Sequence, residues 1–384
     1  MGNLNRREFL QLGVAGTTTA LLGWEGVAGA VQGVSPAAFV FPKPVYRTLG
    51  RTGLKITVIS FGAMLTPEAE VLETAFDHGV NYVDTARVYM GGRNEEIVGR
   101  ALKGRRDRVH VATKTTGRSG KQVIRDVETS LKELDTDHID VIQLHSLSSR
   151  QDRIFNPDIR EALTKLRQQG KVRFFGVTSH RNEAEVLNAL VDDKERFFDV
   201  ALVKYNFQSD AQTTRAVARA AGAGVGIISM KALAGGYRTG ALGPLTPYQA
   251  ALKWVLKNRN VAAIIPGMRD MAELREDIAV MGMPFGPLDR VLLKRYEASI
   301  RPFYCHFCGQ CESTCPHGVE ISTVNRSLMY AEAYRDHALA RSTYRLLPSS
   351  SSASVCLNCP ECVAKCVNRL DIRAKMERAG KLLA

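Results

Sequence analysis

Short apolar runs alternate with amphipathic stretches in a steady order from residue 46 to about residue 298. The apolar runs are mostly continuous, which is typical of parallel strands that are buried on both faces. They predict eight strands, at 56–61, 82–84, 109–113, 139–144, 174–178, 200–204, 226–230 and 262–266. The stretches between them have a helical period and several stop at a glycine, which predicts helices at 123–134, 158–169, 211–221 and 248–257.

Eight strand–helix units favour an α/β fold of the (β/α)8 TIM-barrel type over residues 46–298. A doubly wound open sheet is the alternative, but no Gly-x-Gly-x-x-Gly follows the first strand to support it. The 384 residues also allow a smaller second domain, which we place at 299–384. Hydrophobic residues at 45% and charged residues at 24% exclude a largely disordered chain.

The N-terminus carries the run Asn5-Arg6-Arg7-Glu8-Phe9-Leu10, followed by a weakly apolar stretch that ends in Ala28-Gly29-Ala30. This arrangement resembles a twin-arginine export signal over 1–30 with a small-residue cleavage site, joined to the barrel by a Pro-containing linker at 31–45. Glu25 interrupts the apolar stretch, so a membrane anchor is the weaker alternative and no stable membrane span is expected. We therefore expect an exported, periplasmic or extracytoplasmic protein.

The chain has a formal net charge of +13 at pH 7. Lysine and arginine are dispersed and form no long run, so nucleic acid is not an expected partner. Such a charge suits an acidic redox partner protein or an anionic substrate, or is simply a solvated basic surface.

The cysteines are confined to the C-terminal part of the chain and form two runs of identical spacing. Every cysteine of the first run has a counterpart 51 residues later, and the similarity extends to Val319-Glu320-Ile321 and Leu370-Asp371-Ile372. The two runs are Cys305, Cys308, Cys311 and Cys315, and Cys356, Cys359, Cys362 and Cys366. Three cysteines spaced by two residues allow one tight loop to deliver three thiolates to a cubane, whose fourth ligand comes from elsewhere. Structural zinc and disulfides are the alternatives, but neither needs the fourth cysteine or two matched copies.

Both runs resemble the motif of bacterial ferredoxins with two 4Fe-4S clusters. The resemblance implies that the fourth cysteine of each run binds the other cluster. The implied sets are Cys305, Cys308, Cys311 and Cys366, and Cys356, Cys359, Cys362 and Cys315. Val367 stands where the motif usually has the proline present at Pro316, and a serine-rich stretch at 349–354 predicts a flexible loop before the second run. We expect a small ferredoxin-like domain with two clusters.

The barrel region resembles the aldo/keto reductase family over residues 46 to about 280. The similarity lies in Asp84-Thr85-Ala86-Arg87-Val88-Tyr89, in the opening segment at 46–54, and in Phe61-Gly62-Ala63-Met64. It implies a catalytic tetrad of Asp84, Tyr89, Lys114 and His145. Three of these also follow from position alone, because Asp84, Lys114 and His145 end the second, third and fourth predicted strands, where barrel enzymes place their chemistry. Singly, each has a plain structural explanation, as a cap, a surface lysine or a strand-end histidine.

Carbonyl reduction needs a proton on oxygen while hydride reaches carbon, and Tyr89 is the expected acid. An unperturbed tyrosine has a pKa of about 10. We expect the Lys114 cation to lower the pKa of Tyr89, Asp84 to hold the lysine, and His145 to orient the substrate oxygen.

The resemblance also implies a nicotinamide nucleotide, NADP(H) or NAD(H), across the C-terminal mouth of the barrel. The chain departs from the family's usual residues at two strand ends. After the fifth strand, Gly176-Val177-Thr178-Ser179 stands for the family's Gly-Val-Ser-Asn, so a hydroxyl replaces the usual carboxamide. After the eighth strand, Pro266-Gly267-Met268 lacks the usual lysine at the 2′-phosphate, and Arg269 is expected to substitute for it. The expected contacts are Gly62, Ala63, Met64, Thr178, Ser179, Ser229, Met230, Gly267 and Arg269, while Lys231 is expected to be a local structural or phosphate contact.

These observations predict an NAD(P)-dependent oxidoreductase acting on a small carbonyl or alcohol, with two 4Fe-4S clusters for electron transfer or structure. A nicotinamide delivers two electrons together and a cluster accepts one, so direct electron transfer between them normally needs a flavin, for which no motif is visible. The alternative is an electron-transfer iron–sulfur protein on a barrel that no longer turns over carbonyls.

Overall fold

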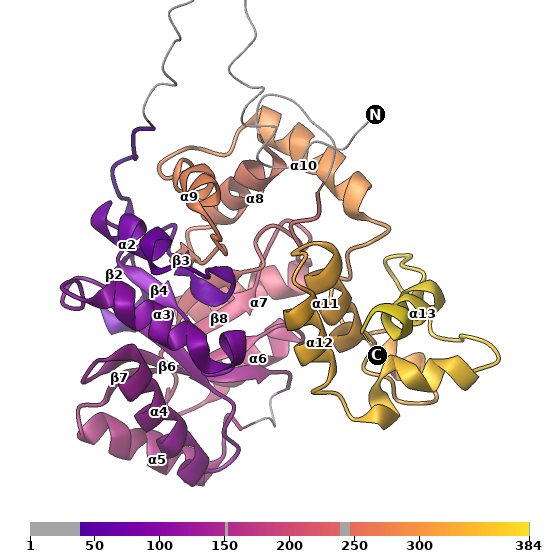
Figure 1. Ribbon diagram of the computed structural model, residues 1–384, viewed down its shortest axis with the longest axis horizontal. Coiled ribbons are helices and arrows are strands. Elements are labelled where there is room, and N and C mark those ends of the chain that lie inside the picture. Colours follow the sequence, from indigo (N-terminus) through magenta and orange to yellow (C-terminus); the bar gives the residue numbers. More distant parts are fainter. Residues whose placement is uncertain (1–38, 150–152, 239–245, 384) are drawn as a thin grey trace, which may run out of the picture.

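A computed structural model describes residues 39–149, 153–238 and 246–383 of the chain (Figure 1). The predicted export signal at 1–30 lies outside the described residues. Within them, no helix combines the length and the apolar character that crossing a membrane requires.

Within the described residues, eight strands form one sheet in which neighbouring strands are parallel and follow chain order. They are β3 (Phe61–Gly62), β4 (Tyr82–Asp84), β5 (His110–Thr115), β6 (Ile139–Leu147), β7 (Val172–Ser179), β8 (Val200–Lys204), β9 (Gly226–Met230) and β10 (Ala263–Ile264).

The two edges of this sheet meet. Ser60 N donates to Ile264 O at 2.8 Å and Gly62 N donates to Pro266 O at 3.0 Å, which joins the first segment to the last. A Cβ atom at Gly62 would lie 2.7 Å from the carbonyl oxygen of Ile265, so this close approach requires glycine. The predicted parallel barrel is confirmed.

The first predicted strand, at 56–61, is wrong as a single element. Residues Lys55–Thr57 form β2, which pairs with β1 (Tyr46–Thr48) in an antiparallel hairpin, and the barrel strand begins only at Phe61. Ile56 is fully buried because it packs with Tyr82 and Val141 in the barrel interior. The apolar run therefore contains two elements: a hairpin strand whose Ile56 fills the barrel interior, and the start of the first barrel strand at Phe61.

The connecting helices cover the outside of the barrel (Figure 1). They are α2 (Ala69–Asp77), α3 (Arg93–Leu102), α4 (Gly120–Leu134), α5 (Pro157–Gln168), α6 (Glu183–Asp192), α7 (Ala211–Gly222), α8 (Pro247–Leu256), α9 (Met271–Ile278) and α10 (Pro287–Ile300). Several begin at a residue whose side chain accepts a backbone N–H of the first turn, as Ser119, Asn156 and Asp210 do. Because the caps and the apolar faces agree with the sequence pattern, the four predicted helices differ from α4, α5, α7 and α8 by at most three residues at either end.

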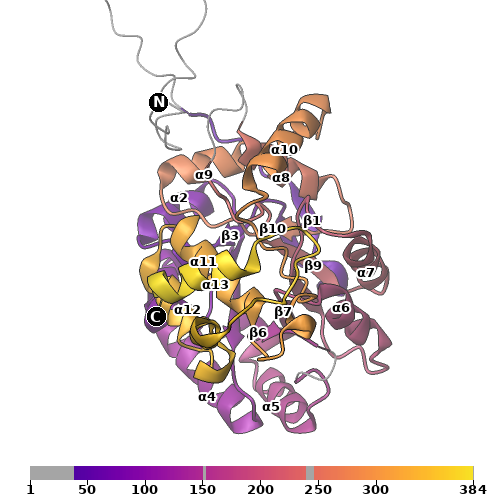
Figure 2. The ribbon, with the colours of Figure 1, turned by 90° about the vertical axis from the view of Figure 1, so that its right-hand side faces the viewer.

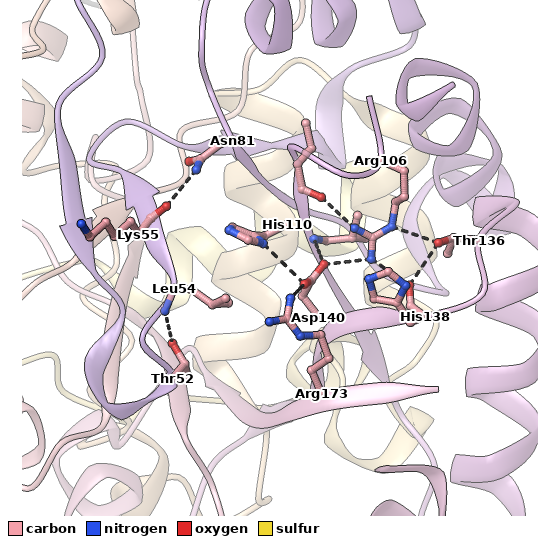
Figure 3. A network of polar contacts seen from close by, with 12 residues as sticks. Thr52, Leu54, Lys55, Asn81, Arg106, His110, Thr136, His138, Asp140 and Arg173 are labelled. Carbon is pink, nitrogen blue, oxygen red and sulfur yellow. Dashed lines mark hydrogen bonds and ion pairs between the residues drawn. The ribbon is translucent and has the colours of Figure 1, made fainter. Parts of the chain in front are cut away.

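Asp140 is the centre of a polar network on β6, close to the N-terminal ends of the strands (Figure 3). Its carboxylate accepts from Arg106, from Arg173 and from the backbone N–H of Val111. Although burial alone would raise the pKa of Asp140, bonding to His110 and the charge of Arg106 hold it well below its usual value. The network therefore ties three neighbouring strands together around one buried charge.

The C-terminal module, defined as residues 301–383, contains α11 (Ile321–Glu332), α12 (His337–Tyr344) and α13 (Ile372–Leu383). Its buried residues, such as Val324 and Ile372, share a core with Tyr248 and Tyr296 of α8 and α10. Figure 2 shows α11, α12 and α13 lying across the end of the barrel strands.

The serine-rich stretch of the module is more ordered than the predicted loop. It forms 3-10 turns at Ser349–Ser351 and Ala353–Asn358. Ser352 Oγ accepts from Ser354 N at 3.3 Å and donates to Ser349 O at 3.1 Å. The expectation of a flexible loop is wrong because these hydroxyls satisfy the local backbone.

Candidate active site

A cavity of about 590 Å³ lies at the C-terminal ends of the barrel strands. The barrel contributes Asp84, Tyr89 and His145 to its lining, and the C-terminal module contributes Arg326 and Tyr330 from α11. This volume is in the range of small-molecule and cofactor sites. The module therefore forms one wall of the cavity.

Three of the four predicted tetrad residues line this cavity, and the fourth, Lys114, is buried behind them. Lys114 Nζ forms a buried ion pair with Asp84 and donates to Thr85 O at 2.6 Å. Lys114 Nζ lies 4.6 Å from the ring centroid of Tyr89, and the rings of Tyr89 and His145 are 5.9 Å apart at an interplanar angle of 81°. Asp84 also accepts from Gln143 Nε2 at 2.8 Å, a contact that the sequence did not indicate.

The protonation of Tyr89 differs from the expectation. Burial raises the pKa of Tyr89 well above its usual value, Asp84 adds to the rise, and Lys231 and Arg326 oppose it. The expected net lowering of the pKa of Tyr89 is wrong, because burial outweighs the nearby cations. Burial also lowers the pKa of His145 well below its usual value, and Lys114 and Arg326 lower it further. The site thus holds a protonated tyrosine beside a neutral histidine near pH 7.

The ion pair beneath the tyrosine is itself shaped by burial. Burial raises the pKa of Asp84, and the charge of Lys114 opposes that rise. Burial lowers the pKa of Lys114, and the charge of Asp84 opposes that fall. Each partner therefore stabilises the charged form of the other.

The nine predicted nucleotide contacts separate into two groups. Five line the cavity: Gly62, Met64, Met230, Gly267 and Arg269. Four do not and are fully buried: Ala63, Thr178, Ser179 and Ser229. The hydroxyls of this second group bond within the barrel, as Ser229 Oγ does with Tyr205 O at 2.7 Å. The structure therefore does not bring these four into the cavity.

Arg269 is held by neighbouring protein groups. It forms an ion pair with Glu273 and donates to the backbone oxygen of Tyr334, in the module, at 3.0 Å. A phosphate that binds here would therefore have to contact a guanidinium that already bonds Glu273 and the backbone of the module.

The module contributes functional groups that the sequence pattern did not reveal. Tyr330 Oη lies 3.4 Å from Lys231 Nζ, which also lies 4.8 Å from the Tyr330 ring centroid. Burial would raise the pKa of Tyr330, but Lys231 and Arg326 lower it below its usual value. The only sequence signal for Arg326 and Tyr330 is their position on an amphipathic helix that follows a cysteine run.

Residues 63–244 match the aldo/keto reductase family. This part of the barrel is therefore similar in sequence to that family. Relatives include the uncharacterized oxidoreductase YqkF of Bacillus subtilis, 36% identical over 152 residues that cover 35% of this chain and 49% of that protein. The match to YqkF thus spans about half of its length.

Two longer matches cover most of the relative's own length. The L-galactose dehydrogenase of Arabidopsis thaliana is 28% identical over 306 residues, covering 67% of this chain and 94% of that protein. The structure of the aldo-keto reductase AKR11C1 from Bacillus halodurans superposes with a TM-score of 0.56 and 23% identity, covering 66% of this chain and 96% of that one. At that identity, the likeness to the solved structure shows the fold alone.

Beyond the barrel, the cysteines lie in two groups. The thiols of Cys311, Cys308 and Cys366 lie close enough to Cys305 to act on its pKa, which burial chiefly raises to about 12. In the second group, Cys315, Cys362 and Cys359 act in the same way on Cys356, and these four line a small cavity of about 40 Å³. In each group, three cysteines of one run meet the fourth cysteine of the other run.

All eight cysteines are free thiols in the structure. Within the described residues, no group of three or more His, Cys, Asp or Glu side chains has the geometry to hold a single metal ion. A 4Fe-4S cubane makes a different demand, because each thiolate binds a different iron and the four ligands surround a space.

Proposed function

We propose that the aldo/keto reductase barrel is an oxidoreductase that transfers hydride between NADP(H) or NAD(H) and a carbonyl or alcohol substrate. The observation that carries this proposal is the convergence of Tyr89, His145 and the buried Lys114–Asp84 pair at one end of a ligand-sized cavity. These are the groups that proton delivery to a carbonyl oxygen requires.

Tyr89 is the proton donor in this proposal. Its raised pKa keeps the hydroxyl protonated across the neutral range, so the donor form is always present. When the proton leaves, the cations of Lys114, Lys231 and Arg326 stabilise the phenolate. The imidazole of His145 is uncharged near pH 7 because its pKa is lowered. It orients the carbonyl oxygen by a hydrogen bond.

Two properties of the cavity support a nicotinamide nucleotide: its volume of about 590 Å³ lies in the range of cofactor sites, and its excess of cations suits an anionic ligand. Gly267 and Arg269 would hold it near β10, and Met230 and Lys231 near β9. When bound, the nucleotide supplies hydride, while the chain supplies the proton and excludes water.

We also propose that the C-terminal module binds two 4Fe-4S clusters. The support is the pairing of the fourth cysteine of each run with the other run, because Cys315 lines one cavity with Cys356, Cys359 and Cys362 and Cys366 lies near Cys305 and Cys311. Such clusters accept and release single electrons. The set around Cys305 adjoins the barrel, because Lys204 Nζ donates to the backbone oxygen of His306 at 2.5 Å. Clusters there would serve either electron transfer or the attachment of the module.

A second candidate function is electron transfer by an iron–sulfur protein on a barrel that no longer turns over carbonyls. Two observations favour it. Arg269 is bonded to Glu273 and to the module, and Thr178 and Ser179 lie outside the cavity. In this case a redox partner protein would bind near the cysteines.

Export by the twin-arginine pathway also remains a proposal. It rests on Arg6 and Arg7 and on the small residues at 28–30. That pathway suits folded proteins with cofactors in place, so we propose that the nucleotide is retained through turnover. Repeated purification of nucleotide-free protein from the periplasm would count against retention, and an uncut N-terminus found only in the cytoplasm would count against export.

The Tyr89→Phe variant tests the enzyme proposal. We expect it to abolish reduction of a panel of aldehydes and ketones while NADPH and NADH bind as in the wild type. Undiminished turnover would remove Tyr89 from the role. If the wild-type protein reduces none of the carbonyls but exchanges electrons with a one-electron acceptor, the second candidate function holds instead.

A further inference from the structure

Arg326 occupies an unusual position for a guanidinium. It projects from α11 into the cavity, and its Nε is buried without a hydrogen-bond partner among the described residues. Its charge acts on Tyr89, His145 and His180, so it lies beside the reacting end of the cavity. His180 Nδ1 is likewise buried without a hydrogen-bond partner among the described residues. Two unsatisfied groups next to the tetrad indicate a ligand that completes their bonding.

The charges that line the cavity are strongly unbalanced among the described residues. The cations are Arg118, Arg153, Lys231, Arg238, Arg269 and Arg326. The carboxylates are Asp84 and Glu273, and each is paired with a cation, Lys114 and Arg269 respectively. A low-dielectric cavity with this lining attracts anions.

A nucleotide phosphate near β10 would meet Arg269, whereas the charge of Arg326 acts on Tyr89 and His145. Arg326, His180 and Ser146 line the main cavity and also an adjoining pocket of about 190 Å³. Thr323 and Thr343 line that pocket as well. The adjoining pocket is therefore polar and small.

One carboxylate, Glu320, also lines the adjoining pocket. Thr323 Oγ1 donates to it at 3.0 Å. Arg181 also lines this pocket, but it is paired with Glu312 at 3.0 Å, whereas Arg326 Nε has no hydrogen-bond partner among the described residues.

We propose that Arg326, with His180 and Ser146, binds the carboxylate of the substrate, so that the barrel acts on short oxo acids and the corresponding hydroxy acids. This inference rests on the proposed function. Arg326 lines the same cavity as Tyr89 and His145 and its charge acts on both. Its planar guanidinium matches a carboxylate next to a carbonyl that Tyr89 and His145 hold. In the reduction, the carbonyl carbon receives hydride from the reduced nucleotide and the carbonyl oxygen receives the Tyr89 proton. Tyr89 is then reprotonated from solvent, and the product is a hydroxy acid.

Two isosteric pairs test the proposal on the complete protein: pyruvate with pyruvamide, and phenylglyoxylate with phenylglyoxylamide. We expect the wild type to prefer each acid over its amide. In Arg326→Met, kcat/KM for the acids falls about 100-fold, as expected when one partner of a desolvated charge pair is removed. In the same variant, kcat/KM for the amides falls much less, because both substrate classes lose the charge of Arg326 beside Tyr89 but only the acids lose a charge pair. Arg326→Lys restores part of the preference for the acids, because it returns the charge without the fork.

The matched control is Arg341→Met, which removes an exposed cation from α12 of the same module. It should leave the acid preference unchanged. Circular dichroism and iron content establish that each variant is folded.

The dissociation constant of NADPH distinguishes a carboxylate-binding Arg326 from an Arg326 that binds the nucleotide. It should be the same in Arg326→Met and the wild type. If this variant weakens NADPH binding and lowers turnover of acids and amides equally, Arg326 serves the nucleotide and the proposal is overturned. Equal use of acids and amides by the wild type would also overturn it while leaving the proposed function intact.

If neither acid nor amide is reduced, calorimetric measurement of phenylglyoxylate binding tests the carboxylate site on its own. Binding that is lost in Arg326→Met supports the carboxylate site although the enzyme proposal has failed. Absence of binding to the wild type overturns both.

Discussion

Replacing Lys114 with methionine removes one half of the ion pair beneath the cavity. The side chains of Lys114 and Asp84 are 1% and 3% exposed, so the carboxylate left behind stays out of water. Gln143 Nε2, at 2.8 Å, is a neutral donor to it. Breaking a buried pair by removing one partner typically costs about 3–5 kcal/mol of unfolding free energy.

The loss should depend on pH in a direction that the structure fixes. Burial raises the pKa of Asp84 and Lys114 is the largest opposing influence, so the variant raises this pKa further. The folded state then holds a proton that an unfolded aspartate, with a pKa of about 3.9, releases. Stability is therefore lost as pH rises from the unfolded towards the folded pKa, by about 1.4 kcal/mol per pH unit. Over two units within that window, the extra loss reaches about 2.7 kcal/mol.

Urea unfolding followed by circular dichroism under argon measures this loss at pH 5, 6, 7 and 8, each relative to the wild type. Lys114→Met should be least destabilised at pH 5 and most at pH 8. The control Lys114→Met with Asp84→Asn carries no buried charge, so its loss should be smaller at pH 8 and nearly independent of pH. An equal loss at every pH, or a double variant less stable than the single one at pH 8, would refute the reasoning.

Three further predictions concern separate parts of the molecule. Because the pKa of Tyr89 is well above its usual value, kcat/KM for carbonyl reduction should not fall between pH 7 and pH 9, and an alkaline decline in that range would contradict the assignment. Asp140→Asn should destabilise the barrel by about 1–3 kcal/mol at pH 7 in urea unfolding. The depressed pKa of Asp140 contributes stability above about pH 4, so the difference in unfolding free energy from the wild type should shrink as pH falls below that value. Cys315→Ala should halve the iron content, from about eight to about four atoms per chain, with Cys366→Ala as the matched variant, and unchanged iron in both would disprove the pairing across runs.

The sequence pattern was sufficient for the barrel. Continuous apolar runs correctly marked β4, β8 and β9 to the residue, because a parallel strand buried on both faces has no polar side to confuse the pattern. The same rule failed at 56–61, where Ile56 is apolar because it plugs the barrel interior. An apolar run alone does not distinguish a buried barrel strand from a segment that fills the barrel interior.

The candidate site was predictable where it depends on strand ends and not where it depends on the module. Asp84, Lys114 and His145 had to meet, because the C-terminal ends of parallel barrel strands share one face. Arg326 and Tyr330 enter the same cavity from a helix that follows the barrel, and nothing in their local pattern fixes how that helix packs. The pKa of Tyr89 was predicted in the wrong direction for the same reason, since the burial that raises it depends partly on the module.

Anaerobic mixing of the protein with NADPH, and then with NADH, in the presence and absence of carbonyl compounds, tests the central claim most directly. The measurement follows nucleotide oxidation, alcohol formation and the absorbance of the iron–sulfur clusters together. We predict that nucleotide is oxidised in proportion to the alcohol formed, and that Tyr89→Phe forms none. If nucleotide neither binds nor reduces any carbonyl while the clusters accept electrons from another donor, the barrel does not carry out the proposed chemistry.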